Sequence, residues 1–144
     1  MLSMNNYGQE YIDECRVKID AQVAAYRELL SAATFAASDT PQLEAAIYAF
    51  EPVFFNNMLH VLDNYFVHRS RMIEKKDGNP LNEVRVLCNC LTNHNGIMTA
   101  DKSIKLDPAR SVLKHQFGDD IKLREPEFVL LAKAFFAEVE SKYR

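Results

Sequence analysis

Apolar residues recur at steps of three and four along most of this chain, and proline or glycine bounds each run. The first run contains Ile12, Cys15, Ile19, Val23, Tyr26, Leu30 and Ala33. One apolar stripe of this period is what an amphipathic helix presents to a core. Similar stripes follow in residues 80–94 and 126–143. The spacing therefore predicts a mainly α protein.

Capping residues and glycines indicate where the helices begin and end. Asp, Asn or Thr stands just before Pro41, Pro80 and Pro108, as is typical of helix starts. Gly78, Gly96 and Gly118 are suited to the left-handed residue that follows a helix. We expect helices at 9–37, 41–76, 80–94, 108–117 and 126–143. Because Pro52 removes a backbone donor, we expect the second to break or kink near Glu51, giving 41–50 and 52–76.

Residues 97–125 have a different pattern. Ile104/Leu106 and Ile121/Leu123 alternate with polar neighbours, as in short half-buried strands. The length of 144 residues fits one domain, and 48% hydrophobic with 26% charged residues is typical of globular chains. We predict a single domain over residues 1–144: a four- to five-helix bundle with a small β or irregular insertion near 97–125.

Charge and hydropathy limit the kinds of binding partner and the cellular location that we expect. A net charge of −3 does not suggest nucleic-acid binding. Residues 50–67 form the most apolar stretch, but polar side chains interrupt it, so we expect no membrane segment. The interrupting residues include Asn56, Asn57, His60, Asp63 and Asn64. The first residues lack the features of a secretory signal, and we expect a cytoplasmic protein. Three cysteines make no disulfide framework, and Cys15 and Cys88 fall on apolar stripes as expected core residues.

The helix expected at 52–76 has an unusual polar face. It collects Asn56, Asn57, His60, Asp63, Asn64, His68 and Arg71. Solvated helix faces favour Glu and Lys, whereas Asn, Asp and His are better hydrogen-bonding groups and ligands. His60, Asn64 and His68 are one turn apart, and Asp63 could orient the His60 imidazole.

Three interpretations of this face stay open. It could be a ligand or catalytic pocket with His60 as general base and Arg71 holding an anion, a divalent-metal site, or a face buried against a partner subunit. Arg69 falls on the apolar side of the same helix, and we expect it to pair with Glu83 if it is buried. The candidate ligand-binding residues are therefore His60, Asp63, Asn64, His68, Arg69 and Arg71. No metal ligands, catalytic residues or cofactor are assigned.

Arg110 and His115 provide a second candidate site. Their Arg-x4-His spacing resembles that of HEPN-type ribonucleases, which are also small helical bundles and often dimers. The resemblance implies an RNase in which these two residues meet across a dimer cleft.

No P-loop, Rossmann glycine pattern, GxSxG or HExxH motif is present. We therefore expect an interaction or ligand-binding module that forms a homo-oligomer. Its contact surface would be the Asn57/His60/Asn64/His68/Arg71 face or the apolar N-terminal helix. The alternatives are a small pocket enzyme, or a binder of metal or a small molecule, built on the His/Asp/Arg cluster, and the HEPN-like ribonuclease.

Overall fold

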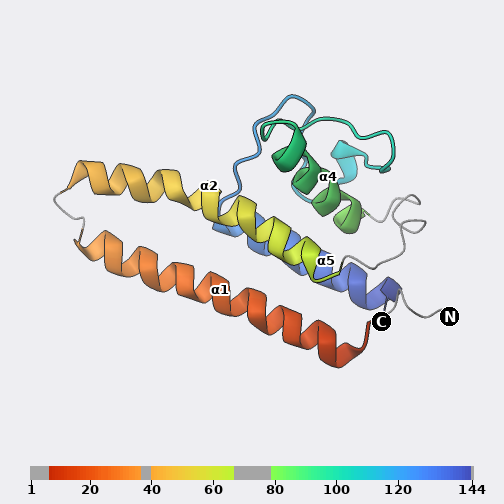
Figure 1. The fold of residues 1–144 in the computed structure, drawn as a ribbon, viewed down its shortest axis with the longest axis horizontal. Helices are drawn as coiled ribbons and strands as arrows, with labels where there is room; N and C mark the ends of the chain where they lie inside the picture. Colours follow the sequence, from red (N-terminus) through yellow and green to blue (C-terminus); the bar gives the residue numbers. More distant parts are fainter. Residues whose placement is uncertain (1–6, 37–39, 67–78, 144) are drawn as a thin grey trace.

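A computed structural model describes residues 7–36, 40–66 and 79–143, and it is mainly helical (Figure 1). The described helices are α1 (Gln9–Ala36), α2 (Pro41–Asn64), α4 (Asn79–Asn93), the short 3₁₀ helix η2 (Pro108–Arg110) and α5 (Glu125–Tyr143). The α-helices begin and end within two residues of the expected bounds, apart from the second, whose expected end at 76 lies outside the described residues. The arrangement is that of a four-helix bundle.

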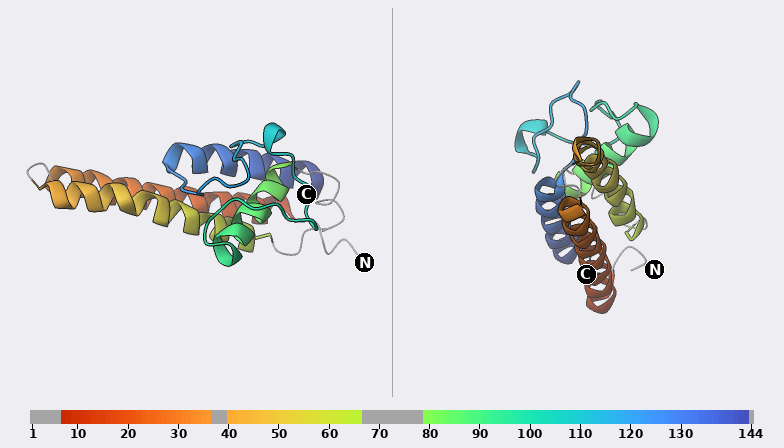
Figure 2. Two further views of the ribbon diagram at one scale, coloured as in Figure 1. Left: turned by 90° about the horizontal axis from the view of Figure 1, so that it is seen from above. Right: turned by 90° about the vertical axis from the view of Figure 1, so that its left-hand side faces the viewer.

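The first two helices form a long antiparallel hairpin. α5 packs against both of them, and α4 packs against α2 and α5. Figure 2 shows that the hairpin projects well beyond α4 and α5 at the end where α1 meets α2. At the other end, the amide of Tyr7 donates a hydrogen bond to the carbonyl of Tyr143, so α5 finishes beside the start of α1.

The core lies where α1, α2, α4 and α5 all meet. The predicted stripe of α1 is buried as far as Tyr26, which is 4% exposed, whereas Leu30 and Ala33 are only partly buried. Cys15 and Cys88 are buried among apolar side chains, which confirms their prediction as core residues. Burial of these stripes supplies the main driving force for the bundle.

The division of α2 at Glu51 was wrong, because the helix continues through Pro52. A proline inside a helix leaves the carbonyl four residues earlier without its usual donor. Here that carbonyl belongs to Tyr48, and Nη1 of Arg124 donates to it at 3.2 Å. A tertiary hydrogen bond thus replaces the helical one at the proline.

The predicted strands and the helix at 108–117 were also wrong. Residues 97–124 are irregular, with one antiparallel bridge between Ile97 and Asp120 and the single turn η2. Side chains on the helices hold this segment in place. In the side chain of Asn56, Nδ2 donates a hydrogen bond to the carbonyl of Ile121 at 2.8 Å, and Oδ1 accepts one from the backbone amide of Leu123 at 3.0 Å. The side chain thus bonds the backbone as a neighbouring strand would.

Candidate interaction surface

The polar face of α2 is only partly described. Asn57 and Asn64 are exposed, and His60 is partly buried. Asp63 forms an ion pair with Arg85 of α4, with Oδ1 and Nε 3.5 Å apart. Among the described residues, no hydrogen bond joins His60 to Asp63. His68, Arg69 and Arg71 lie outside the described residues, so the ligand-binding role of this set stays a prediction.

In the described part of the chain, Glu83 forms no ion pair. Its side chain is 1% exposed, and its two carboxylate oxygens accept hydrogen bonds from the amides of Val112 and Leu113 at 2.8 and 2.9 Å. Burial raises the pKa of the Glu83 carboxyl, and the two hydrogen bonds partly oppose that shift. Through these two hydrogen bonds, Glu83 holds the irregular segment against α4. Its expected partner, Arg69, lies outside the described residues.

The remaining chemical candidates are dispersed. Arg110 is exposed at the end of η2, and His115 is partly buried in the irregular segment, so a long helix does not present this pair. Cys90 is buried, and its thiol exchanges hydrogen bonds with the backbone of Thr99. In the described ranges, no group of three His, Cys, Asp or Glu side chains is placed to hold a metal ion.

Sequence reasoning named the apolar N-terminal helix as a possible contact surface, but it did not single out the projecting part of the hairpin. We define the arm as residues 27–36 of α1 together with residues 41–51 of α2. None of these residues is buried, although the apolar spacing of the body continues into the arm. Helices are stabilised mainly by burial of an apolar face, so a bare arm of this kind leaves that stabilisation incomplete.

An ionic cluster closes the base of the arm on the side of α5. Arg124 lies over the ring of Tyr48, 3.6 Å from its centroid, and Nη1 bonds Oε1 of Glu51 at 2.7 Å. The second carboxylate oxygen of Glu51 accepts a hydrogen bond at 2.9 Å from the backbone amide of Glu125, the first residue of α5. Arg27 bonds the Glu125 carboxylate at 2.6 Å. Glu51 therefore caps the first turn of α5, the last helix of the bundle.

A groove also lies along the arm. It has a volume of about 300 Å³ and lies between α1 and α2. The residues lining it are all apolar or aromatic: Tyr26, Leu29, Leu30, Ala33, Ala46, Ile47 and Phe50. Leu29 is 59% exposed and Phe50 43% exposed.

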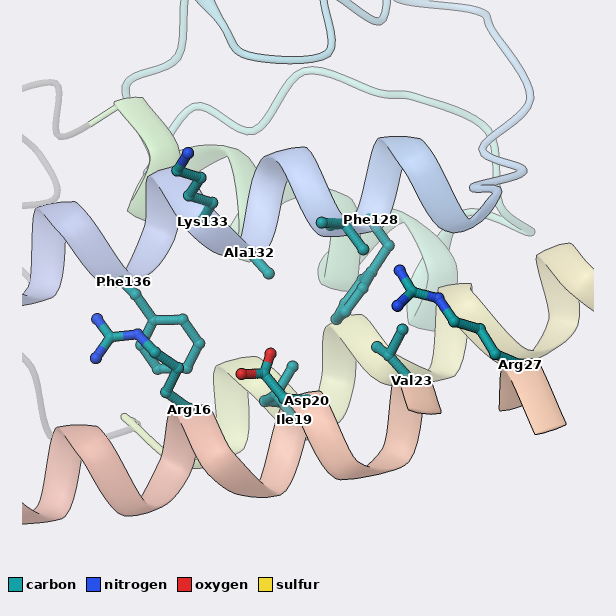
Figure 3. A pocket seen from close by; sticks show the side chains of 10 residues that line it. Arg16, Ile19, Asp20, Val23, Arg27, Phe128, Ala132, Lys133 and Phe136 are labelled. Atoms are coloured by element: carbon teal, nitrogen blue, oxygen red, sulfur yellow. The ribbon is translucent and has the colours of Figure 1, made fainter. Parts of the chain in front are cut away.

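A second groove lies between α1 and α5 (Figure 3). It has a volume of about 380 Å³, a floor that includes Phe128 and Phe136, and a rim with Arg16, Arg27, Lys133 and Asp20. The cations of this rim are largely engaged. Arg16 binds Asp13 and Glu140, and Arg27 binds Glu125. These contacts hold α1 against α5 and neutralise the charges on the rim. The groove on the arm, with its exposed apolar lining, is therefore the better candidate for an interaction surface.

The described elements define a class: a mainly helical, bundle-like protein in which one pair of helices extends beyond the others, with an apolar groove between the two. No helix among the described residues has both the length and the hydropathy required to span a bilayer. No protein-family model, curated protein or solved structure matches the chain.

Proposed function

We propose that this chain is an interaction module that forms a homo-oligomer and that the arm is its docking element. The observation that carries the proposal is the absence of any buried residue in the arm, although apolar side chains line a groove there. Exposed apolar surface of this kind, set beside polar surface, is typical of protein–protein contacts.

One face of α2 changes from apolar to polar residues along the helix, and this change supports the arm as the docking surface. Ala46, Phe50, Val53, Asn57 and Asn64 are separated by three, four or seven residues and so share one face of the helix. This face is apolar in and next to the arm and polar beside the body of the bundle. Because this face of α2 is apolar in and next to the arm, it favours a contact made there, with the Asn57/His60/Asn64 region at its edge.

Sedimentation equilibrium of two matched lysine variants tests this function. Leu29 in the arm and Leu130 on α5 are 59% and 54% exposed, respectively. We expect Leu29→Lys to raise the dissociation constant of the oligomer at least about tenfold, because a charge would have to be desolvated in the contact. Leu130→Lys should leave the constant unchanged. A wild-type chain that stays monomeric up to about millimolar concentration, where even weak contacts populate, would refute the proposal.

The cytoplasmic location is part of the same proposal. Cys15, Cys88 and Cys90 are free thiols, which is the usual state in a reducing compartment. Fractionation of cells that express the tagged chain, with thiol alkylation before lysis, measures both the location and the state of these cysteines.

A further inference from the structure

We propose that the groove between α1 and α5 binds a free amino acid with a bulky apolar side chain. The carboxylate of Asp20 holds the ammonium group of this ligand, the ammonium of Lys133 holds its carboxylate, and the apolar floor accommodates its side chain. This groove is distinct from the one on the arm. The inference therefore goes beyond the interaction module proposed above and does not depend on it.

The floor of the groove is apolar and held in place by the core. It is lined by Ile19 and Val23 of α1 and by Phe128, Ala132 and Phe136 of α5, each at most 6% exposed. Because these side chains are packed in the core, the floor is formed before a ligand arrives, which lowers the entropic cost of binding. The volume of about 380 Å³ falls in the range of small-molecule sites. The floor thus favours an apolar group of modest size.

Two ion pairs across the groove determine how α1 and α5 face each other. Arg16 bonds Glu140 near one end, and Arg27 bonds Glu125 at 2.6 Å near the other. The two helices are therefore antiparallel along the groove. Because carboxylates already compensate both guanidinium groups, neither arginine is the main anchor for a charged ligand.

Asp20 and Lys133 lie between these two ion pairs, on the same faces of their helices. Asp20 is seven residues from Arg27, and Lys133 is seven residues from Glu140, which is about two helical turns in each case. Both side chains line the groove and are exposed, and neither forms an ion pair or hydrogen bond with another described residue. The groove thus offers one free anion on α1 and one free cation on α5.

The positions of these two charges suit a zwitterion. Figure 3 shows the Asp20 carboxylate directed into the space between the two helices. The Lys133 side chain extends away from Asp20 in the same view, and its flexible four-carbon stem allows the ammonium to turn toward the groove. A ligand that carries only an anion or only a cation would leave one of the two uncompensated. Charge complementarity therefore favours an amino acid over a simple amine or a fatty acid.

An NMR titration of the full chain with L-phenylalanine tests the proposal. A ligand of this size should bind with a dissociation constant on the order of a millimolar, so the titration extends to about 10 mM. We expect shifts of backbone amides along the groove, at Ile19, Val23 and Ala132, and none at Ala46 in the arm. Glycine, the same zwitterion without a side chain, should produce no saturable shift. Absence of saturation with L-phenylalanine, or shifts confined to the arm, would overturn the proposal.

Two substitutions and two analogues identify the charged contacts. Asp20→Asn should weaken binding of L-phenylalanine about threefold, but not that of phenylpropionate, which lacks the ammonium. Lys133→Gln should have a similar effect on L-phenylalanine, but not on phenylalaninamide, which lacks the carboxylate. Glu28→Gln and Lys102→Gln are the controls, since each removes one exposed charge outside the groove. Unchanged binding in both groove variants, or equal weakening by all four substitutions, would refute the assigned site.

Discussion

Nη1 of Arg124 lies 3.2 Å from the carbonyl oxygen of Tyr48, the oxygen that Pro52 deprives of its helical donor. The same nitrogen bonds Glu51, and Glu51 caps α5. A proline inside α2 is thus coupled to the start of a helix more than 70 residues later. The apolar arm begins at this junction.

Replacing Arg124 should loosen the junction. Arg124→Met removes the donor to Tyr48 and leaves Glu51 without its cation, so we expect the free energy of unfolding to fall by roughly 1–3 kcal/mol. Lys122→Met, two residues away on an exposed side chain, is the control and should change stability by less than about 0.5 kcal/mol. Urea unfolding measures both. Equal effects of the two substitutions would show that the Arg124 contacts contribute nothing specific.

Asn56 should be required for order in the segment that leads into α5. Asn56→Ala removes two hydrogen bonds to the backbone of Ile121 and Leu123, and we expect a loss of about 1–3 kcal/mol. Hydrogen exchange of the Leu123 amide should accelerate, because that amide loses its acceptor. Asn57→Ala, at the exposed neighbouring position, should leave this amide protected. Unchanged exchange in Asn56→Ala would contradict the assignment.

Glu83 should make stability depend on pH in an unusual direction. Burial raises its pKa in the folded chain above the ordinary value of 4.5, so the folded state binds the proton more tightly than the unfolded state. The contribution of Glu83 to stability is therefore fully present below about pH 4.5 and is lost as the pH rises through the folded-state pKa. Relative to Glu83→Gln, the wild-type free energy of unfolding should increase as the pH falls through this window.

The comparison uses urea unfolding of both proteins from about pH 8 down to about pH 4, which spans the ordinary carboxyl range. A difference between wild type and Glu83→Gln that stays constant across the series would mean that Glu83 titrates alike in both states. Other carboxyls cancel in this difference, because both proteins carry them.

Substitutions of Tyr26 can separate the contribution of its ring to stability from that of its hydroxyl. The ring lies 5.0 Å from Phe54 and 4.9 Å from Phe55, between centroids, whereas the buried hydroxyl has no hydrogen-bond partner among the described residues. We expect Tyr26→Phe to leave thermal stability unchanged or slightly raised. Tyr26→Leu should cost about 1–3 kcal/mol through lost ring packing. Destabilisation by Tyr26→Phe as large as that by Tyr26→Leu would point to a bond made by the hydroxyl.

The helices could be predicted from sequence because their signals are local. The stripe from Ile12 to Tyr26 and the residues around Pro80 and Pro126 each lie within a few turns of the boundary they indicate. The irregular segment could not be predicted, since Asn56 and Glu83 hold it from helices far away in sequence. Continuity through Pro52 likewise depends on Arg124, which no pattern around the proline reveals.

The groove was missed for a related reason. Leu30 and Ala33 continue the stripe of Tyr26 without any change in spacing, so periodicity alone predicts that they enter the core. Whether they do depends on where α5 begins, and the Glu51–Glu125 contact determines that. The polar face around His60 was visible in sequence. Among its described members, however, Asn56 bonds the segment before α5, Asp63 pairs with Arg85 of α4, and Asn57 and Asn64 are exposed.

The hydrogen bond between Tyr7 and Tyr143 has a practical consequence. Both ends of the described chain leave the bundle at the same corner, and Figure 1 shows that this corner lies opposite the tip of the arm. α1 alone, with 28 residues, is roughly 42 Å long at 1.5 Å per residue. Fluorophores attached at either terminus would therefore report on the arm from a distance without obstructing it.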